Sequence, residues 1–63
     1  MTEPEILQDA YEQSIRELYK TFFAAFTSAL GDEQQEKAAE EHFQAGIAHA
    51  KHVRDLALRL LED

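Results

Sequence analysis

Three histidines, His42, His49 and His52, are the side chains of this sequence best suited to metal binding or proton transfer. His42 and His49 are seven residues apart, so they share one face of a helix, and His52 follows three residues after His49. The residues three positions before these histidines are Ala39, Gly46 and His49, so the Glu-x-x-His motif of di-iron bundles is missing, as is His-Glu-x-x-His. We therefore predict a structural role for the histidines at the edge of a helix seam. A metal or small-ligand site is the alternative.

Arg54 is the second polar residue with an unusual position. Helical spacing places it on the apolar stripe between Ala50 and Ala57. A guanidinium group that is partly removed from water needs a carboxylate partner. In a hairpin that turns at the middle of the chain, Glu12 lies at the level of Arg54. We therefore predict a structural ion pair between Arg54 and Glu12.

A run of aromatic residues between positions 19 and 26 predicts a contact surface. Exposed apolar patches of this size are rare on monomeric proteins, so the run favours contact between copies of the chain, with another protein as the alternative partner. Two apolar residues of the second half of the chain complete the predicted interface. Its members are Tyr19, Phe22, Phe23, Phe26, Phe43 and Ile47.

The elements that position these residues are two long helices. Thr2 and Glu5 form a capping-box pattern, and Pro4 falls in a first turn, where it costs no hydrogen bond. Apolar residues then recur at spacings of three and four, which predicts a helix over about residues 3–30. At 100° per residue these side chains span an arc of about 160°, wider than one partner helix can cover.

Gly31 and Asp32 predict the turn between the helices. Glycine readily adopts the left-handed conformation that ends a helix, and Asp32 followed by Gln35 suits the start of the next helix. The second helix is predicted over about residues 33–61. Gly46 lies in its interior and costs about 1 kcal/mol relative to alanine. We expect an aromatic ring of the first helix to pack over this glycine.

Composition bounds the rest. The chain has 63 residues, no cysteine and a net charge of −7. A domain this short buries about 60% of its unfolded surface, so association between copies is the expected source of further stability. Excess negative charge disfavours nucleic-acid binding. The sequence lacks both a long apolar run and a basic, apolar leader, so we expect a cytoplasmic protein that does not enter the membrane.

The turn at mid-chain, the overall length and the Asp32-Glu33-Gln34 start of the second helix resemble those of the Rop family of plasmid RNA-binding proteins. The resemblance implies a hairpin that dimerises into a four-helix bundle and binds RNA through a basic, phenylalanine-containing face of its first helix. The first helix of this chain departs from that pattern, because it carries five acidic residues against Arg16 and Lys20 as its bases.

Together these features predict an all-α fold, an antiparallel helical hairpin that dimerises into a four-helix bundle. No arrangement of nucleophile and base suggests catalysis, so we predict a small protein-protein interaction or assembly factor that is not an enzyme and needs no cofactor. The two alternatives are a metal- or ligand-binding bundle that uses the histidines, and a Rop-like RNA-binding hairpin dimer.

Overall fold

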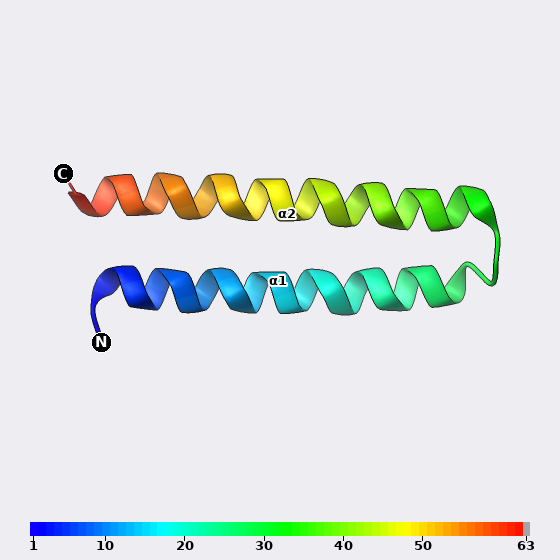
Figure 1. The fold of residues 1–63 in the computed structure, drawn as a ribbon, viewed down its shortest axis with the longest axis horizontal. Helices are drawn as coiled ribbons and strands as arrows, with labels where there is room; N and C mark the ends of the chain where they lie inside the picture. Colours follow the sequence, from blue (N-terminus) through cyan, green and yellow to red (C-terminus); the bar gives the residue numbers. More distant parts are fainter. Residues whose placement is uncertain (63) are drawn as a thin grey trace.

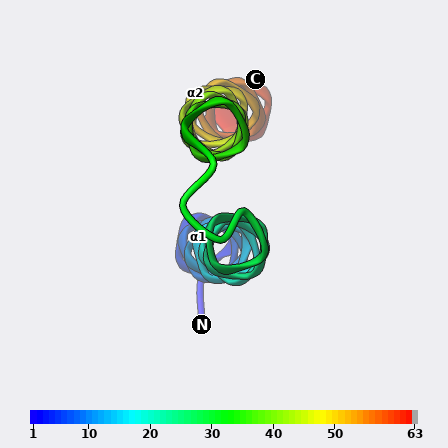
Figure 2. The same ribbon diagram turned by 90° about the vertical axis from the view of Figure 1, so that its right-hand side faces the viewer.

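The computed structural model, which describes residues 1–62, consists of two antiparallel helices (Figure 1). Helix α1 spans Glu3–Ser28 and helix α2 spans Glu33–Glu62. The predicted all-α hairpin is confirmed. Its Cα atoms extend over 47 × 18 × 6 Å, and the end-on view of Figure 2 shows the two helices side by side as a single layer. The molecule is therefore a thin slab with two broad faces.

Helix α1 begins where the capping pattern indicates. The backbone N–H of Glu5 donates to the Thr2 hydroxyl at 3.4 Å, and Thr2 itself has extended backbone angles. Pro4 occupies the first turn, where no intrahelical hydrogen bond is lost. Glu3 and Glu5 place negative charge at the positive end of the helix dipole.

The turn is reached two residues earlier than the sequence suggests, because α1 ends at Ser28. The N–H of Ala29 still donates to the carbonyl of Ala25 at 3.1 Å, but Leu30 has a φ of 52° and Gly31 a φ of 85°. The left-handed conformation expected for Gly31 is confirmed, and Leu30 shares it. That conformation costs a residue with a Cβ atom about 1–2 kcal/mol.

Asp32 caps α2. Its carboxylate accepts hydrogen bonds from the backbone N–H groups of Gln34 at 2.9 Å and Gln35 at 3.2 Å. The N–H of Glu36 donates to the Asp32 carbonyl at 2.9 Å, which closes the first helical turn. Two otherwise unpaired N–H groups are thus satisfied by a single side chain.

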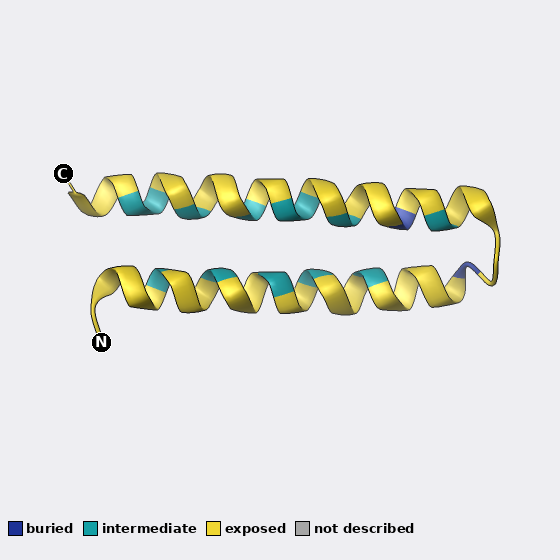
Figure 3. Cartoon of the chain, viewed as in Figure 1, coloured by how far each residue is buried: buried dark blue, intermediate teal, exposed yellow. Residues whose placement is uncertain are grey.

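The helices touch along one seam, where the half-buried side chains of both face each other (Figure 3). The rings of Phe22 and Phe43 lie 5.0 Å apart, and the Arg54 guanidinium lies 4.3 Å from the centre of the Tyr11 ring. These two contacts set the register of the hairpin. The other half-buried apolar residues of the seam are Leu7, Ile15, Leu18, Ile47, Ala50, Ala57 and Leu58.

The seam leaves the core incomplete. Within residues 1–62 only Ala29 and Ala39 are buried, and no larger side chain is fully enclosed. The accessible surface is 5043 Å², whereas a compact monomer of 7.2 kDa exposes roughly 4,100 Å². The hairpin therefore exposes roughly 900 Å² more than a compact protein of its mass.

The contact over Gly46 is aliphatic, so the prediction of an aromatic ring at this position is wrong. An added Cβ on Gly46 would lie 2.5 Å from Cδ2 and 3.3 Å from Cδ1 of Leu18. The aromatic side chain one turn further along α1, Phe22, packs on Phe43 instead. The register brings Leu18 level with Gly46, so the glycine makes room for a branched aliphatic side chain.

We predict that the effect of Gly46→Ala depends on Leu18. In a Leu18→Ala background the new methyl group meets free space, so Gly46→Ala gains its helix propensity of about 1 kcal/mol. In the wild type Leu18 must change rotamer, so we expect a result less favourable by at least about 0.5 kcal/mol. Chemical denaturation of the four chains of this double-mutant cycle measures the difference. Equal effects in both backgrounds would show that Leu18 does not press on Gly46.

Candidate interaction surfaces

One broad face of the hairpin carries an exposed aromatic surface, which we define as Tyr19, Phe23, Phe26 and Leu30. Tyr19 and Phe23 are 57% and 58% exposed, and Leu30 is 90% exposed. Tyr19 and Phe23 are one turn apart on α1, and their ring centroids lie 6.2 Å apart with the planes tilted by 34°. The result is a row of apolar side chains, each partly covered by the rest of the hairpin and partly exposed to water.

The other predicted interface residues lie in or beside the seam of the hairpin itself. Phe22, Phe43 and Ile47 are half-buried. Phe22 contacts Phe43 across the seam and also lies 5.6 Å from the ring of Phe26. Phe22 therefore connects the seam to the aromatic surface, and the predicted set divides into residues that hold the hairpin and residues that face outward.

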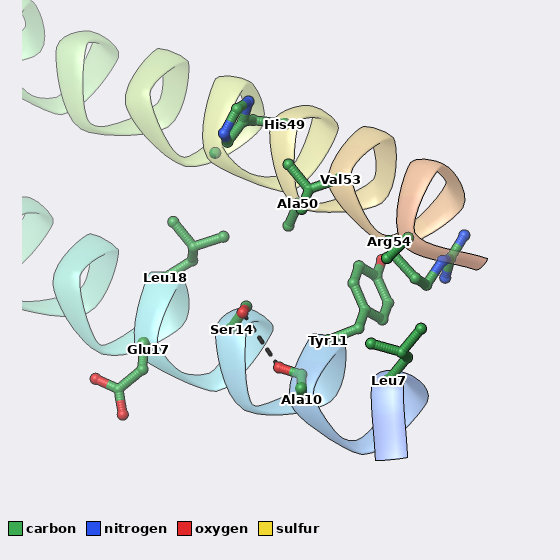
Figure 4. Close-up of a pocket in the computed structure, with 12 residues that line it drawn as sticks. Leu7, Ala10, Tyr11, Ser14, Glu17, Leu18, His49, Ala50, Val53 and Arg54 are labelled. Carbon is green, nitrogen blue, oxygen red and sulfur yellow. Dashed lines mark hydrogen bonds between the residues drawn. The ribbon is translucent and has the colours of Figure 1, made fainter. Parts of the chain in front are cut away.

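Two hollows open on the opposite broad face, which we call the groove face. The larger hollow, of about 510 Å³, lies between the helices, with Leu18 and Ser14 on α1 facing Val53 on α2 (Figure 4). The smaller hollow, of about 350 Å³, lies near the turn. It is lined by Thr21, Phe22, Ala25, Gln35, Ala38, Ala39 and His42.

Helical geometry explains why the two surfaces lie on different faces. At 100° per residue, Ser14, Thr21 and Ala25 fall on one flank of the α1 seam, and Tyr19 and Phe23 fall on the other. The α1 flank of the groove face thus carries the small residues Ser14, Thr21 and Ala25, while the aromatic residues Tyr19 and Phe23 lie on the opposite flank. The same helix presents two chemically different surfaces.

All three histidines are exposed; His42 and His49 lie on the groove face, whereas His52 lines neither hollow. His42 lines the smaller hollow with Thr21, and His49 lines the larger one with Ser14. The hydroxyl of Ser14 is engaged elsewhere, since it donates to the Ala10 carbonyl at 3.2 Å (Figure 4). Among residues 1–62 no group of three histidine, aspartate or glutamate side chains is close enough to hold a metal ion.

Arg54 pairs with a different carboxylate from the one predicted. Its Nε and Nη2 atoms donate to Oδ1 of Asp55 at 3.2 and 3.1 Å, and its guanidinium stacks on Tyr11. Glu12 instead accepts a hydrogen bond from Gln8 at 3.4 Å. Tyr11 occupies the position beside Arg54, and the next residue, Glu12, is rotated away by about 100°. Tyr11 also lies near the level of Arg54 in the sequence, but a search for oppositely charged partners does not consider a cation–π contact.

No family model, curated protein or solved structure matches the chain. Its function must therefore be inferred from its own surfaces. Within residues 1–62, neither helix is long and apolar enough to cross a bilayer.

We predict that Zn²⁺ or Fe²⁺ in modest excess leaves the melting temperature almost unchanged. The Cα atoms of His42 and His49 are about 10 Å apart along the helix, so both imidazoles reach one ion only in strongly extended conformations. A stable site would also need further ligands. A specific site saturated at 100 times its dissociation constant would add about 2.7 kcal/mol of stability. Thermal melts with and without metal measure this. A rise of several degrees that His49→Ala abolishes would support the metal-binding alternative.

Proposed function

We propose that this chain is a small, non-enzymatic protein-protein interaction or assembly factor that acts as a homo-oligomeric helical bundle. The observation that carries the proposal is the location of its large apolar side chains. Many of them, including Tyr19, Phe23 and Leu60, are exposed on a hairpin whose described residues bury only Ala29 and Ala39. Such a hairpin gains most of its possible hydrophobic stabilisation only when another chain covers it.

The exposed area matches what one partner supplies. The hairpin exposes roughly 900 Å² more than a compact monomer of 7.2 kDa. A standard stable interface buries about 800 Å² on each partner. Association with at least one further copy is thus needed to remove the excess surface.

The aromatic surface supports contact between copies. A fully buried phenylalanine contributes about 1.5–3 kcal/mol, so burial of Phe23 and Phe26 would contribute a large fraction of the stability of a small domain. Pairing two hairpins over such rows of side chains gives a four-helix bundle. The partner in this proposal is a second copy of the chain, and a different protein is the alternative.

RNA binding of the Rop type receives less support. A protein that binds RNA phosphates needs a basic surface, whereas this chain has a net charge of −7. Helix α1 carries Arg16 and Lys20, and the Lys20 ammonium lies 3.9 Å from the Glu17 carboxylate. The exposed features of α1 are apolar side chains and acids, which suit a protein partner better.

We predict that Phe23→Asp reduces the molar mass of the assembly in solution by half or more. A charge in the middle of the aromatic surface cannot be buried without a partner, so this contact is lost. Light scattering coupled to size exclusion measures the mass, and circular dichroism follows helicity at the same concentrations. Gln13→Asp is the matched control, because it introduces the same side chain at an exposed position of α1 away from the aromatic surface.

The same measurement on the wild type decides the proposal. A well-folded wild-type species of 7.2 kDa at micromolar concentration would overturn it, because the exposed apolar surface would then be stable without a partner. An assembly whose mass Phe23→Asp leaves unchanged would place the contact elsewhere on the hairpin.

A further inference from the structure

On the groove face, α2 carries large exposed side chains toward the open end, beside the larger hollow, and small residues of both helices lie near the turn. Val53, Leu56 and Leu60 follow each other on α2 at spacings of three and four, and they are 48%, 43% and 65% exposed. They form a ridge toward the open end of the hairpin. Near the turn, the same face has the smaller hollow, which includes Ala25 and Ala38 among its lining residues.

The seam contacts give the level of every residue along the hairpin. Phe22 is level with Phe43, and Tyr11 is level with Arg54. Counting inward from either pair brings Arg16 level with His49. This level lies close to the middle of both helices, so it is the natural place for a two-fold axis that relates two hairpins laid face to face in opposite directions.

Rotation about that axis brings the large residues of α2 opposite small or polar ones of the other copy. Residues equally distant from His49 on its two sides come to face each other, since α2 then runs antiparallel to its own copy. His49 meets the His49 of the second copy. The facing pairs along the groove face are Val53 with Ala45, Leu56 with His42, and Leu60 with Ala38.

Helix α1 shows the same complementarity about the same level. Residues equally distant from Arg16 come opposite each other, so Leu18 faces Ser14 and Leu7 faces Ala25. These four residues line the two hollows. A large side chain opposite a small one lets helices approach closely and leaves no void. One axis therefore satisfies both helices at once.

The opposite orientation, turn against turn, fits poorly. It would place α2 over α1 of the second copy at equal levels, with Leu56 near Ala10 and with Leu7 and Leu60 at the same end. Leu7 and Leu60 of both copies would then meet at the open end. The smaller, alanine-lined hollows would face each other near the turn and leave a void, which costs stability.

The groove face also has the charge and the size that an interface needs. Of the residues that line its two hollows, Glu17 and Arg54 alone carry a full charge, and Asp55 already neutralises Arg54. Little desolvation penalty opposes its burial. The broad face measures 47 × 18 Å between Cα atoms, roughly 850 Å², comparable with the share of one partner in a stable interface.

We propose that the groove face docks a second copy of this chain in the antiparallel orientation, with the Val53–Leu56–Leu60 ridge of each copy over the small residues around Ala38 and His42 of the other. This contact goes beyond the aromatic contact proposed above and does not use it. A chain with self-contacts on both broad faces joins two neighbours, so its assembly is larger than a dimer.

Cysteine cross-linking tests the orientation, and the chain has no native cysteine to interfere. Leu56→Cys and His42→Cys chains, mixed and oxidised, should give a covalent heterodimer in preference to either homodimer, because a disulfide requires Cα atoms within about 7 Å. The matched control mixes Leu56→Cys with Ala10→Cys, which link only in the turn-against-turn orientation. Preferential linkage of the control pair, or no linkage of either pair, would overturn the proposal.

Molar mass tests the independence of the two contacts. Leu56→Asp should lower the wild-type mass to that of a dimer held by the aromatic surface, and the double variant Leu56→Asp, Phe23→Asp should be monomeric. Ala48→Asp, on the exposed back of α2, should leave the mass unchanged. A wild-type dimer that Leu56→Asp leaves intact would overturn the groove contact while leaving the proposed function in place.

The Phe23→Asp variant separates the two failures. If the pair of cysteines at positions 42 and 56 still links in that background, the groove contact stands by itself. If Phe23→Asp leaves the wild-type mass unchanged while the cross-link forms, the aromatic contact fails and the groove contact holds. If Phe23→Asp abolishes the cross-link in a chain that keeps its helicity, the independence of the two contacts is refuted.

Discussion

Two helices placed side by side touch along a single line, and the rest of this molecule follows from that constraint. One line of contact covers a narrow stripe on each helix. The apolar residues of α1 extend well beyond this stripe to Tyr19 and Phe23, and Leu30 in the turn is exposed as well. The short turn at Gly31 and Asp32 fixes the pairing of the helices but adds no third element to cover the remainder. Unsatisfied apolar surface is thus built into the topology.

The contacts within the seam determine what the two outer faces present. Leu18 fits against Gly46, and the ring of Phe22 packs on Phe43. This register brings the middle of α1 level with His49 and places small residues of both helices together near the turn. The groove face consequently has its smaller hollow near the turn, and the large side chains of α2 lie toward the open end, beside the larger hollow. Internal packing and external complementarity are therefore set by the same register.

Much of this structure could be predicted from the sequence, because local signals act over a few residues. Thr2, Asp32 and Gly31 have the caps and the backbone conformation expected of them. The partners of individual side chains could not be predicted, because they change when a helix rotates about its axis by less than the 100° between successive residues. For this reason Arg54 contacts the Tyr11 ring and pairs with Asp55, and it does not pair with Glu12. The aromatic run predicts an interaction surface from the sequence alone. The groove face could not be predicted, because its small residues are recognised as a surface only once the structure shows the hollows between them.

In the proposed association, shape has to supply the specificity, because charge opposes it. Each copy brings a net charge of −7, so approaching chains repel one another, and non-specific contact between apolar patches is disfavoured. Repulsion of this kind is spread over the surface and screened beyond about 10 Å at ordinary ionic strength, whereas close packing acts over a few ångströms. The proposed arrangement inserts large side chains into hollows and would gain many close contacts against this repulsion, whereas a loose arrangement would gain few. The acidic surface and the graded groove face together favour one mode of association over many.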